Sequence, residues 1–182
     1  SFNGKIILIK KLWNYIKLRA WLKIPITILG VYIIMLIVVP LPRPLFSNDY
    51  ATVLEDREGL LLSATLSRDQ QWRFPPTDSV PYKFSTAIRL FEDEYFFLHP
   101  GVNPVSIIRA ARQNISAGEI VSGGSTITMQ TIRLALNNSN RSFFQKLYEI
   151  HLAIKLDLLY SKKSILVLYA SHAPFGGNIV GV

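Results

Sequence analysis

Residues 92–101 of this chain read Glu-Asp-Glu-Tyr-Phe-Phe-Leu-His-Pro-Gly, and residues 123–130 read Gly-Gly-Ser-Thr-Ile-Thr-Met-Gln. The first stretch sets three acids among aromatic residues, and a carboxylate that loses water beside aromatic rings is a candidate general base. The second stretch places flexible backbone before an expected helix start, where free N–H groups, hydroxyls and the helix dipole suit a phosphate. The two stretches predict a catalytic site that combines a base with an anion-binding loop.

Both stretches also have simpler interpretations. Three consecutive acids are common at a solvated helix end. The catalytic interpretation instead uses a helix on which Glu92 shares a face with Phe96. The glycine pair could be an ordinary loop before a helix, with Ser125 as its N-cap. Without a following Gly-Lys-Ser/Thr, it is not a P-loop. The residues alone leave these alternatives open.

A third feature is the pair Lys146 and Glu149, three positions apart in a segment with an apolar stripe. Such a pair is usually a surface ion pair worth about 0.2–0.5 kcal/mol. The same geometry could offer a cation to a phosphate and a carboxylate to a metal or a sugar hydroxyl. We interpret the three histidines as structural: His99, His151 and His172.

Near the N-terminus, the segment from Ile24 to Leu41 contains no charged residue, and 12 of its positions are Ile, Leu or Val. At roughly 0.4 kcal/mol each, these residues favour the bilayer by about 5 kcal/mol. Pro25 and Pro40 bracket the segment instead of interrupting it. We therefore expect a transmembrane helix over residues 24–42. A buried core helix and a cleaved signal peptide are the alternatives.

The charge distribution predicts the orientation of this helix. Residues 1–23 carry six basic side chains and no acid, whereas the rest of the chain has a net charge of only +2. A short basic flank is typical of the cytoplasmic side, so everything after Arg43 is expected outside the cytoplasmic (inner) membrane. Aromatic residues among the lysines suit an interfacial segment on anionic lipid. A nucleic-acid-binding arm would not explain the adjacent apolar span, and we expect no nucleic-acid partner.

The remaining residues, 43–182, are enough for one modest domain, which we expect to be mainly α with a small β entry. A hairpin is predicted around a turn at 55–59, and a further strand at 71–74. Helices are predicted by their apolar spacing near 83–96, 104–117, 125–137, 142–160 and 162–171. The chain has no cysteine, which excludes disulfides and thiolate-metal sites, and its histidines lack the spacing of a zinc site.

Four groups of residues follow one another in the order that a known family shows. The first group is Glu92, Asp93, Phe96, His99 and Gly101, followed by Arg109. The second is Gly123, Gly124, Ser125, Thr126, Thr128 and Gln130. The third is Lys146, Glu149, Ala153, Leu156 and Asp157, and the fourth is Lys162, Tyr169, Gly176 and Gly181. In this order they resemble the peptidoglycan glycosyltransferases, glycosyltransferase family 51, of class A penicillin-binding proteins, most of all the penicillin-binding protein 1C group.

The resemblance implies a lysozyme-like fold that polymerises lipid II into β-1,4-linked glycan with inversion and releases undecaprenyl pyrophosphate. It implies Glu92 as the general base. Glu149 is implied as a second catalytic residue and as a candidate ligand for Mg²⁺ or Mn²⁺, with no organic cofactor. Pyrophosphate or substrate binding is implied for Lys146, Arg109, Gly123, Gly124, Ser125, Thr126, Thr128 and Gln130. A supporting role is implied for Asp93, Phe96, His99 and Gly101.

The resemblance also implies partners: lipid II, the growing glycan, membrane lipids and other proteins of cell-wall synthesis or division. Val167 and Ser171 depart from it, standing where the family usually has Glu and Asn. The family domain continues beyond Val182, so we expect an N-terminal fragment that is incomplete as an enzyme. Two alternatives remain: an inactive membrane-anchored scaffold that binds lipid II, and a lysozyme-like enzyme that cleaves glycan.

Overall fold

The computed structural model describes residues 21, 23–76, 78–137 and 142–181. The chain divides into two compact units, residues 1–40 and 41–182, which are considered separately. In the first unit, residue 21 and residues 23–38 are helical, and the helix ends before the predicted boundary at residue 42. The rest of the basic segment 1–23 lies outside the described residues. Among the described residues, no helix combines the length and apolarity needed to cross a membrane, so the predicted transmembrane helix is not found there.

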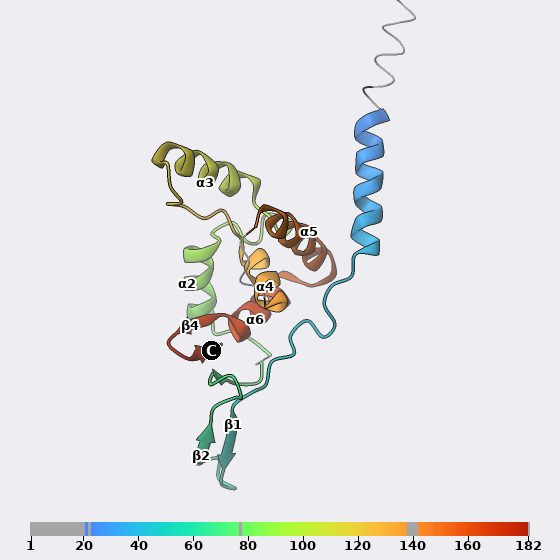
Figure 1. Cartoon of the computed structure of the whole chain (residues 1–182). Coiled ribbons are helices and arrows are strands. Elements are labelled where there is room, and N and C mark those ends of the chain that lie inside the picture. The colour runs from blue at the N-terminus through green and yellow to red at the C-terminus, as the bar shows by residue number, and fades with distance from the viewer. Residues whose placement is uncertain (1–20, 22, 77, 138–141, 182) are drawn as a thin grey trace, which may run out of the picture. The chain divides into compact units, whose positions relative to one another are not determined.

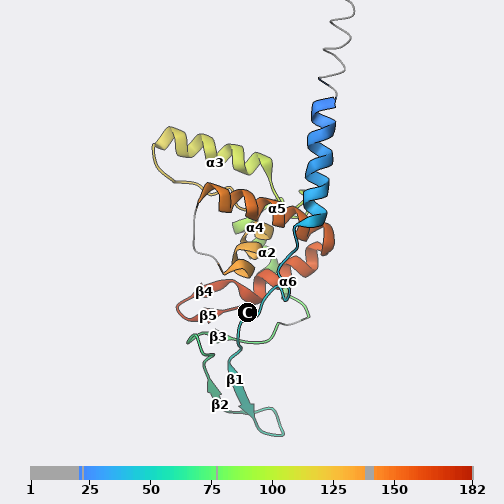
Figure 2. The same ribbon diagram turned by 45° about the vertical axis from the view of Figure 1, so that its right-hand side comes forward.

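The second unit is mainly helical, which confirms that part of the predicted fold class. Its helices, labelled in Figures 1 and 2, are α2 (Tyr82–Glu92), α3 (Pro104–Ala117), α4 (Ile127–Leu136), α5 (Phe143–Leu159) and α6 (Lys162–His172). All five lie within a few residues of the predicted ranges. The largest difference is in α2, which ends four residues earlier than predicted.

The early end of α2 has a tertiary cause. Asp93 leaves the helix with φ −161° and ψ 77°, while its backbone N–H still donates to the carbonyl of Arg89. In this conformation the Asp93 carboxylate turns inward and accepts a hydrogen bond from the backbone N–H of Ile127, 34 residues away. Residues 94–98 form turns instead of a continuing helix. The interpretation that placed Glu92 and Phe96 on one helical face is therefore wrong.

Helix α3, in contrast, has bounds that its own sequence determines. The Asn103 side chain accepts from the backbone N–H of Ser106 as an N-cap, and Pro104 takes the first helical position. At the other end, Gly118 adopts a left-handed conformation with φ 72°, which glycine reaches at little cost. These signals are local, so the predicted and observed ranges coincide.

Helix α4 forms the centre of the core. Ile127, Met129 and Ile132 have no exposed surface, and α4 packs against both α5 and α6. Figures 1 and 2 show it among the other helices from two directions. A helix buried on most of its circumference is held rigidly by packing. Side chains that α4 carries toward a site are therefore well fixed.

The β structure is small. Strands β1 (Thr52–Glu55) and β2 (Leu61–Thr65) form the predicted antiparallel hairpin. Strand β3 (Trp72–Arg73) falls within the strand predicted at 71–74, and it pairs in parallel with β5 (Ile179–Val180). Strand β4 (Pro174–Gly176) pairs antiparallel with β5. The sequence did not indicate β4 and β5. Because β5 pairs with β3, it connects the last described residues to the strand at Trp72–Arg73.

Candidate active site

Glu92, the predicted base, is the last residue of α2. Its side chain is half-buried, and Oε2 accepts a hydrogen bond of 2.7 Å from Nε2 of Gln130 on α4. Glu92 also lines a cavity of about 130 Å³ together with Glu94 and Arg109. The carboxylate is thus held on one side and borders an open space on the other. This geometry suits a group that exchanges a proton with a bound molecule.

Gln130 has partners that the sequence did not predict. Its Oε1 accepts a hydrogen bond of 3.3 Å from the phenol of Tyr169 on α6. Tyr169 is buried, and this burial, together with the negative charge of Glu92, raises the pKa of its phenol to about 12. Gln130 was expected to bind substrate or pyrophosphate, but the structure places its amide between Glu92 and Tyr169.

Asp93 and His99 form a buried pair beneath the site. His99 Nε2 lies 2.9 and 3.0 Å from the two carboxylate oxygens of Asp93. Asp93 also accepts from the N–H of Ile127 at 3.1 Å, at the positive end of the α4 dipole. Asp93 therefore joins the end of α2 to the start of α4, and both side chains are less than one-tenth exposed, which suits a supporting role.

Lys162 holds the turn that carries Phe96 and His99. Its Nζ donates to the carbonyl of His99 at 2.7 Å and forms an ion pair of 2.6 Å with Asp157. The same ammonium lies 4.7 Å from the centre of the Phe96 ring, within the range of a cation–π interaction. Phe96 is fully buried, so its supporting role is one of packing.

The start of α4 is capped by Thr126 and not by Ser125. The Thr126 hydroxyl accepts from the N–H of Met129 at 3.1 Å and donates to the carbonyl of Gly101 at 2.6 Å. Thr126 and Thr128 are almost completely buried, so neither hydroxyl can contact a ligand in this conformation. Ser125 is released from capping, and its hydroxyl turns toward the cations described next.

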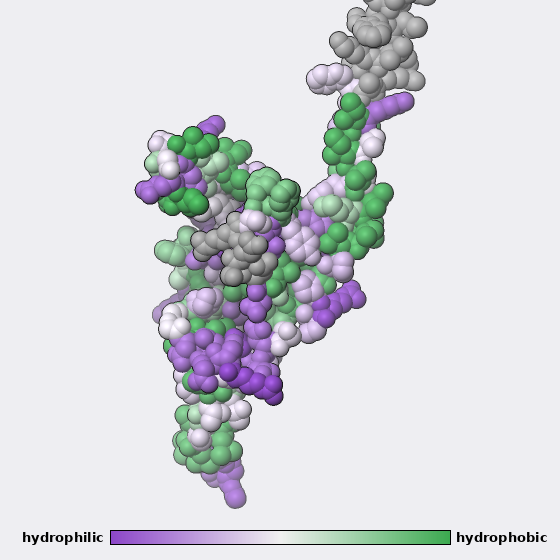
Figure 3. Space-filling model, viewed as in Figure 1, coloured by the Kyte–Doolittle hydropathy of each residue, from purple (hydrophilic) through white to green (hydrophobic). Residues whose placement is uncertain are grey.

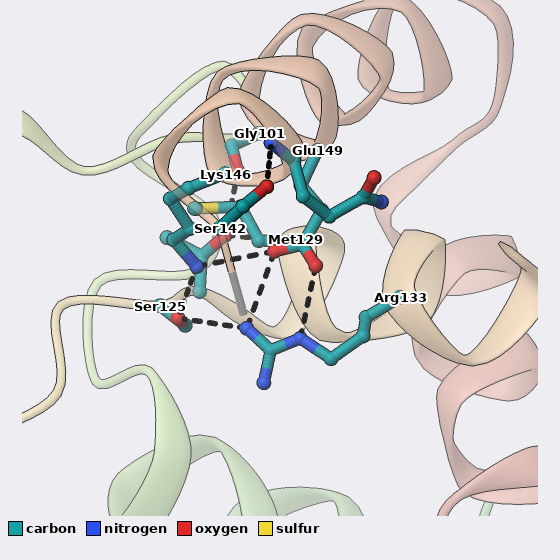
Figure 4. Close-up of polar contacts among 9 residues, drawn as sticks. Gly101, Ser125, Met129, Arg133, Ser142, Lys146 and Glu149 are labelled. Atoms are coloured by element: carbon teal, nitrogen blue, oxygen red, sulfur yellow. Dashed lines mark hydrogen bonds and ion pairs between the residues drawn. The ribbon is translucent and has the colours of Figure 1, made fainter. Parts of the chain in front are cut away.

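A compact ionic cluster surrounds Glu149, which is only 3% exposed (Figure 4). Arg133 donates to both of its oxygens, from Nε at 3.1 Å and from Nη2 at 3.2 Å. Lys146 donates from Nζ to Oε2 at 3.2 Å. The surface ion pair that the spacing also allowed is therefore not what forms. One buried carboxylate instead aligns two cations.

Ser125 completes the cluster. Its Oγ accepts from Lys146 Nζ at 2.7 Å and from Arg133 Nη2 at 3.3 Å. The side chains of Arg133 and Lys146 are 41% and 37% exposed, in contrast to that of Glu149. Two cations against one anion leave a net positive charge that solvent or a ligand can reach. Such a group can bind an anion with several oxygens, such as a pyrophosphate.

The charge of Lys146 depends on its neighbours. Burial lowers the pKa of the Lys146 ammonium, Glu149 opposes this effect, and the positive charge of Arg133 lowers the pKa again. A cation in this position is short of compensating negative charge. An anionic ligand would supply that charge, which favours anion binding at this cluster.

Two glycines, Gly124 before α4 and Gly101 before α3, lie very close to the backbone of a neighbouring helix. A Cβ on Gly124 would lie 2.9 Å from Cα of Ile107 on α3, whereas a Cβ on Gly123 would meet nothing within 4 Å. Gly101, with φ 76°, leaves no room for a Cβ against the carbonyl of Ala153 on α5. Gly124 and Gly101 therefore allow close backbone approaches that a side chain would prevent, and the binding role expected of Gly124 stays a prediction.

The structure brings together three of the predicted anion-binding and catalytic residues, Ser125, Lys146 and Glu149. It places Arg109 elsewhere, exposed on α3 and lining the small cavity beside Glu92. Arg133 was missed by the sequence analysis. Its position three residues after Gln130, on the same turn of a predicted helix, was a signal that could have identified it.

A metal ion does not fit Glu149 in this arrangement, because both of its oxygens already accept from cationic donors. In the described part of the chain, no three acidic or histidine side chains gather as a metal site would require. The expectation of Mg²⁺ or Mn²⁺ at Glu149 therefore finds no support in the side chains around it.

Comparisons with known proteins agree with the resemblance seen in the sequence. A family model described as "Transglycosylase" matches residues 58–182. Penicillin-binding protein 1C of Escherichia coli (strain K12) is 39% identical over 142 residues, which cover 78% of this chain and 18% of that protein. Penicillin-binding protein 1A of Aquifex aeolicus (strain VF5) is 39% identical over 105 residues, covering 58% of this chain and 14% of that protein. The chain thus spans less than a fifth of the length of these two relatives.

Proposed function

Because this chain belongs to the transglycosylase family, we propose that it is the peptidoglycan glycosyltransferase region of a longer penicillin-binding protein. The substrate is lipid II, which is joined into β-1,4-linked glycan with inversion and release of undecaprenyl pyrophosphate. One observation carries the proposal. Helix α4 holds Glu92 through Gln130 and, three residues later, places Arg133 in the cationic cluster. Gln130 and Arg133 lie on α4 about one helical turn apart, so this one buried helix holds the base on one turn and the anion site on the next.

In the proposed reaction, Glu92 takes the proton from the 4-hydroxyl of the acceptor sugar as that oxygen attacks the anomeric carbon of the donor. The new C–O bond forms while the bond from this carbon to the pyrophosphate oxygen breaks, and the electron pair leaves with the pyrophosphate. Pyrophosphate is a good leaving group, so it needs charge stabilisation more than a strong acid. Lys146, Arg133 and Ser125 supply that stabilisation from one side.

The proposed roles of Glu149 and Arg109 differ from those first expected. Glu149 acts by aligning Arg133 and Lys146, because its burial keeps it from the reacting atoms. Arg109 lies on the side of Glu92, and we place it where the acceptor enters. The proposal needs no metal ion held by these residues. A divalent cation that accompanies the pyrophosphate, and recruitment by other cell-wall or division proteins, stay predictions from the resemblance.

Lipid is the proposed environment of the helix at residues 23–38. Large apolar side chains are exposed along it, including Ile26 at 66%, Ile34 at 61% and Val38 at 70%, and Figure 3 shows green residues over much of this helix. An apolar surface of this kind marks contact with a membrane or a partner. We propose attachment to the cytoplasmic membrane with the second unit on its outer face, where lipid II is also held.

The proposal is tested with the longer natural protein that contains this chain and with labelled lipid II. Glu92→Gln keeps the size of the side chain but removes the base, and the rate of glycan polymerisation is expected to fall at least about 100-fold. Glu119→Gln, the same change at an exposed loop position, is the control and should polymerise like the wild type. Polymerisation by Glu92→Gln at the wild-type rate would contradict the proposal. Cleavage of glycan would support the hydrolase, and binding without any product would support the scaffold.

A further inference from the structure

The Glu92 carboxylate is one end of a hydrogen-bonded chain that runs through three helices. Tyr169 on α6 donates to Gln130 Oε1 at 3.3 Å, and Gln130 Nε2 on α4 donates to Glu92 Oε2 at 2.7 Å. Glu92 and Gln130 are 38 positions apart in sequence, and Gln130 and Tyr169 are 39 positions apart. Tyr169 is 5% exposed, so it does not itself border the space beside Glu92.

The two ends of this chain together favour one direction of donation. Burial and the charge of Glu92 raise the pKa of Tyr169 to about 12, so the phenol keeps its proton throughout the range in which an enzyme is assayed. A protonated phenol can donate to the amide oxygen, which leaves the amide nitrogen to face the carboxylate. A reversed amide would oppose its oxygen to the negative charge of Glu92. The Glu92 carboxylate, which can only accept, therefore requires the orientation in which Gln130 donates to it, and Tyr169 stabilises that orientation by donating to the amide oxygen.

We propose that Tyr169 is a positioning residue which, through Gln130, aims the Glu92 carboxylate. The inference rests on the proposed role of Glu92 as the base. With Oε2 occupied by Gln130, Oε1 is the oxygen left for the acceptor hydroxyl. Loss of the Tyr169 hydroxyl should loosen the Gln130 amide and so the hydrogen bond that Glu92 accepts from it. Since a hydrogen bond to the charged form of a carboxyl group favours that form, the pH profile of the reaction can report this loss.

Other charges near Glu92 do not change when Tyr169 is replaced by phenylalanine. Charged and titratable groups on the elements around Glu92 lie beside the cavity, on α2 to α6 and in the turn after α2, and they include Tyr82, Lys83, Arg89, Asp93, Glu94, Tyr95, Arg109, Arg112, Arg133, Lys146, Glu149, Lys162, Lys163, Tyr169 and His172. Tyr169→Phe removes a hydroxyl from a neutral ring and changes none of the other groups. A shift of the pH profile in this variant would therefore report the hydrogen-bonded chain and not a new charge.

The test measures lipid II polymerisation by the longer natural protein from pH 5 to 9. For Tyr169→Phe, the acidic limb of kcat/KM is expected to move to higher pH by about half to one unit, with KM above that limb unchanged within about twofold. Gln130→Met, which keeps the side-chain volume, should shift the limb in the same direction and at least as far. The double variant should show no further shift, because Tyr169 acts only through Gln130. Tyr160→Phe, at an exposed tyrosine, is the control.

Three outcomes would overturn the inference: an unmoved acidic limb in Tyr169→Phe, shifts that add in the double variant, or an equal fall of activity at every pH. A merely structural role of Tyr169 would produce the last of these. Loss of polymerisation in Glu92→Gln alongside any of them leaves the proposed function standing. If Glu92→Gln polymerises normally, the proposed function fails and this inference fails with it. If Tyr169→Phe does not fold, the acidic limb of Gln130→Met decides alone.

Discussion

Glu149 organises the ionic cluster although almost none of its surface is exposed. It accepts hydrogen bonds from Arg133 and Lys146 on both carboxylate oxygens. Burying a carboxylate is unfavourable unless it is paired, and here two cations share the pairing. Its negative charge also opposes the repulsion between these cations, so the residue determines how strongly Lys146 holds its proton.

Glu149→Gln is therefore expected to change the response to alkaline pH. Burial lowers the pKa of Lys146, Glu149 raises it, and Arg133 lowers it. Without the negative charge of Glu149, the pKa of Lys146 should fall further below its ordinary value. The ammonium that stabilises pyrophosphate would then be lost at a lower pH. In polymerisation assays, the basic limb of kcat/KM should move to lower pH by about one unit.

Glu119→Gln provides the comparison, since it makes the same change in net charge at an exposed residue that is not part of the described cluster. Its basic limb should coincide with that of the wild type. A basic limb of Glu149→Gln that stayed in place or moved to higher pH would show that Glu149 does not sustain the charge of Lys146.

At the scale of elements, the loop before α4 depends on its distance from α3. A Cβ at Gly124 would approach Ile107 Cα at 2.9 Å and the Ser106 carbonyl oxygen at 3.1 Å. Backbone atoms of a helix cannot move aside as a flexible side chain can. The loop would have to shift instead, and Ser125, which follows directly, would shift with it.

Gly124→Ala is thus expected to destabilise this region by about 1–3 kcal/mol and to slow polymerisation by displacing Ser125 from Lys146. The matched control is Gly123→Ala, where a Cβ has open space. Thermal unfolding should shift by several degrees for Gly124→Ala and by less than about one degree for Gly123→Ala. Equal unfolding temperatures for the two variants would mean that α3 does not constrain the loop.

At the scale of the whole molecule, the apolar helix at residues 23–38 is proposed to attach the protein to lipid. The longer natural protein is expected to remain with membranes after an alkaline wash, because the uncharged segment from Ile24 to Leu41 is expected from its sequence to favour the bilayer by about 5 kcal/mol. A variant that lacks residues 1–40 should be released. Deletion of residues 1–20 alone keeps the helix and should leave the protein with the membrane fraction. Release of all three proteins to the same extent would contradict the proposal.

Sequence alone determined those parts of the protein whose causes lie close together along the chain. Helix α3 is bounded by Asn103, Pro104 and Gly118, which act on their immediate neighbours, and its range was predicted correctly. The motif order likewise indicated the family and named Glu92, Lys146 and Ser125. In each case the signal is residue type and spacing within a short segment.

Tertiary structure alone decided which groups meet. Asp93 ends α2 because it binds the N–H of Ile127, Thr126 takes the N-cap by reaching Gly101, and Arg133 joins the cluster through Glu149, 16 residues away. Spacing along a chain does not encode such partners, since they depend on how helices pack. The physical reason is burial: once α4 is enclosed, each polar group on it must find its partner on whichever helix lies opposite.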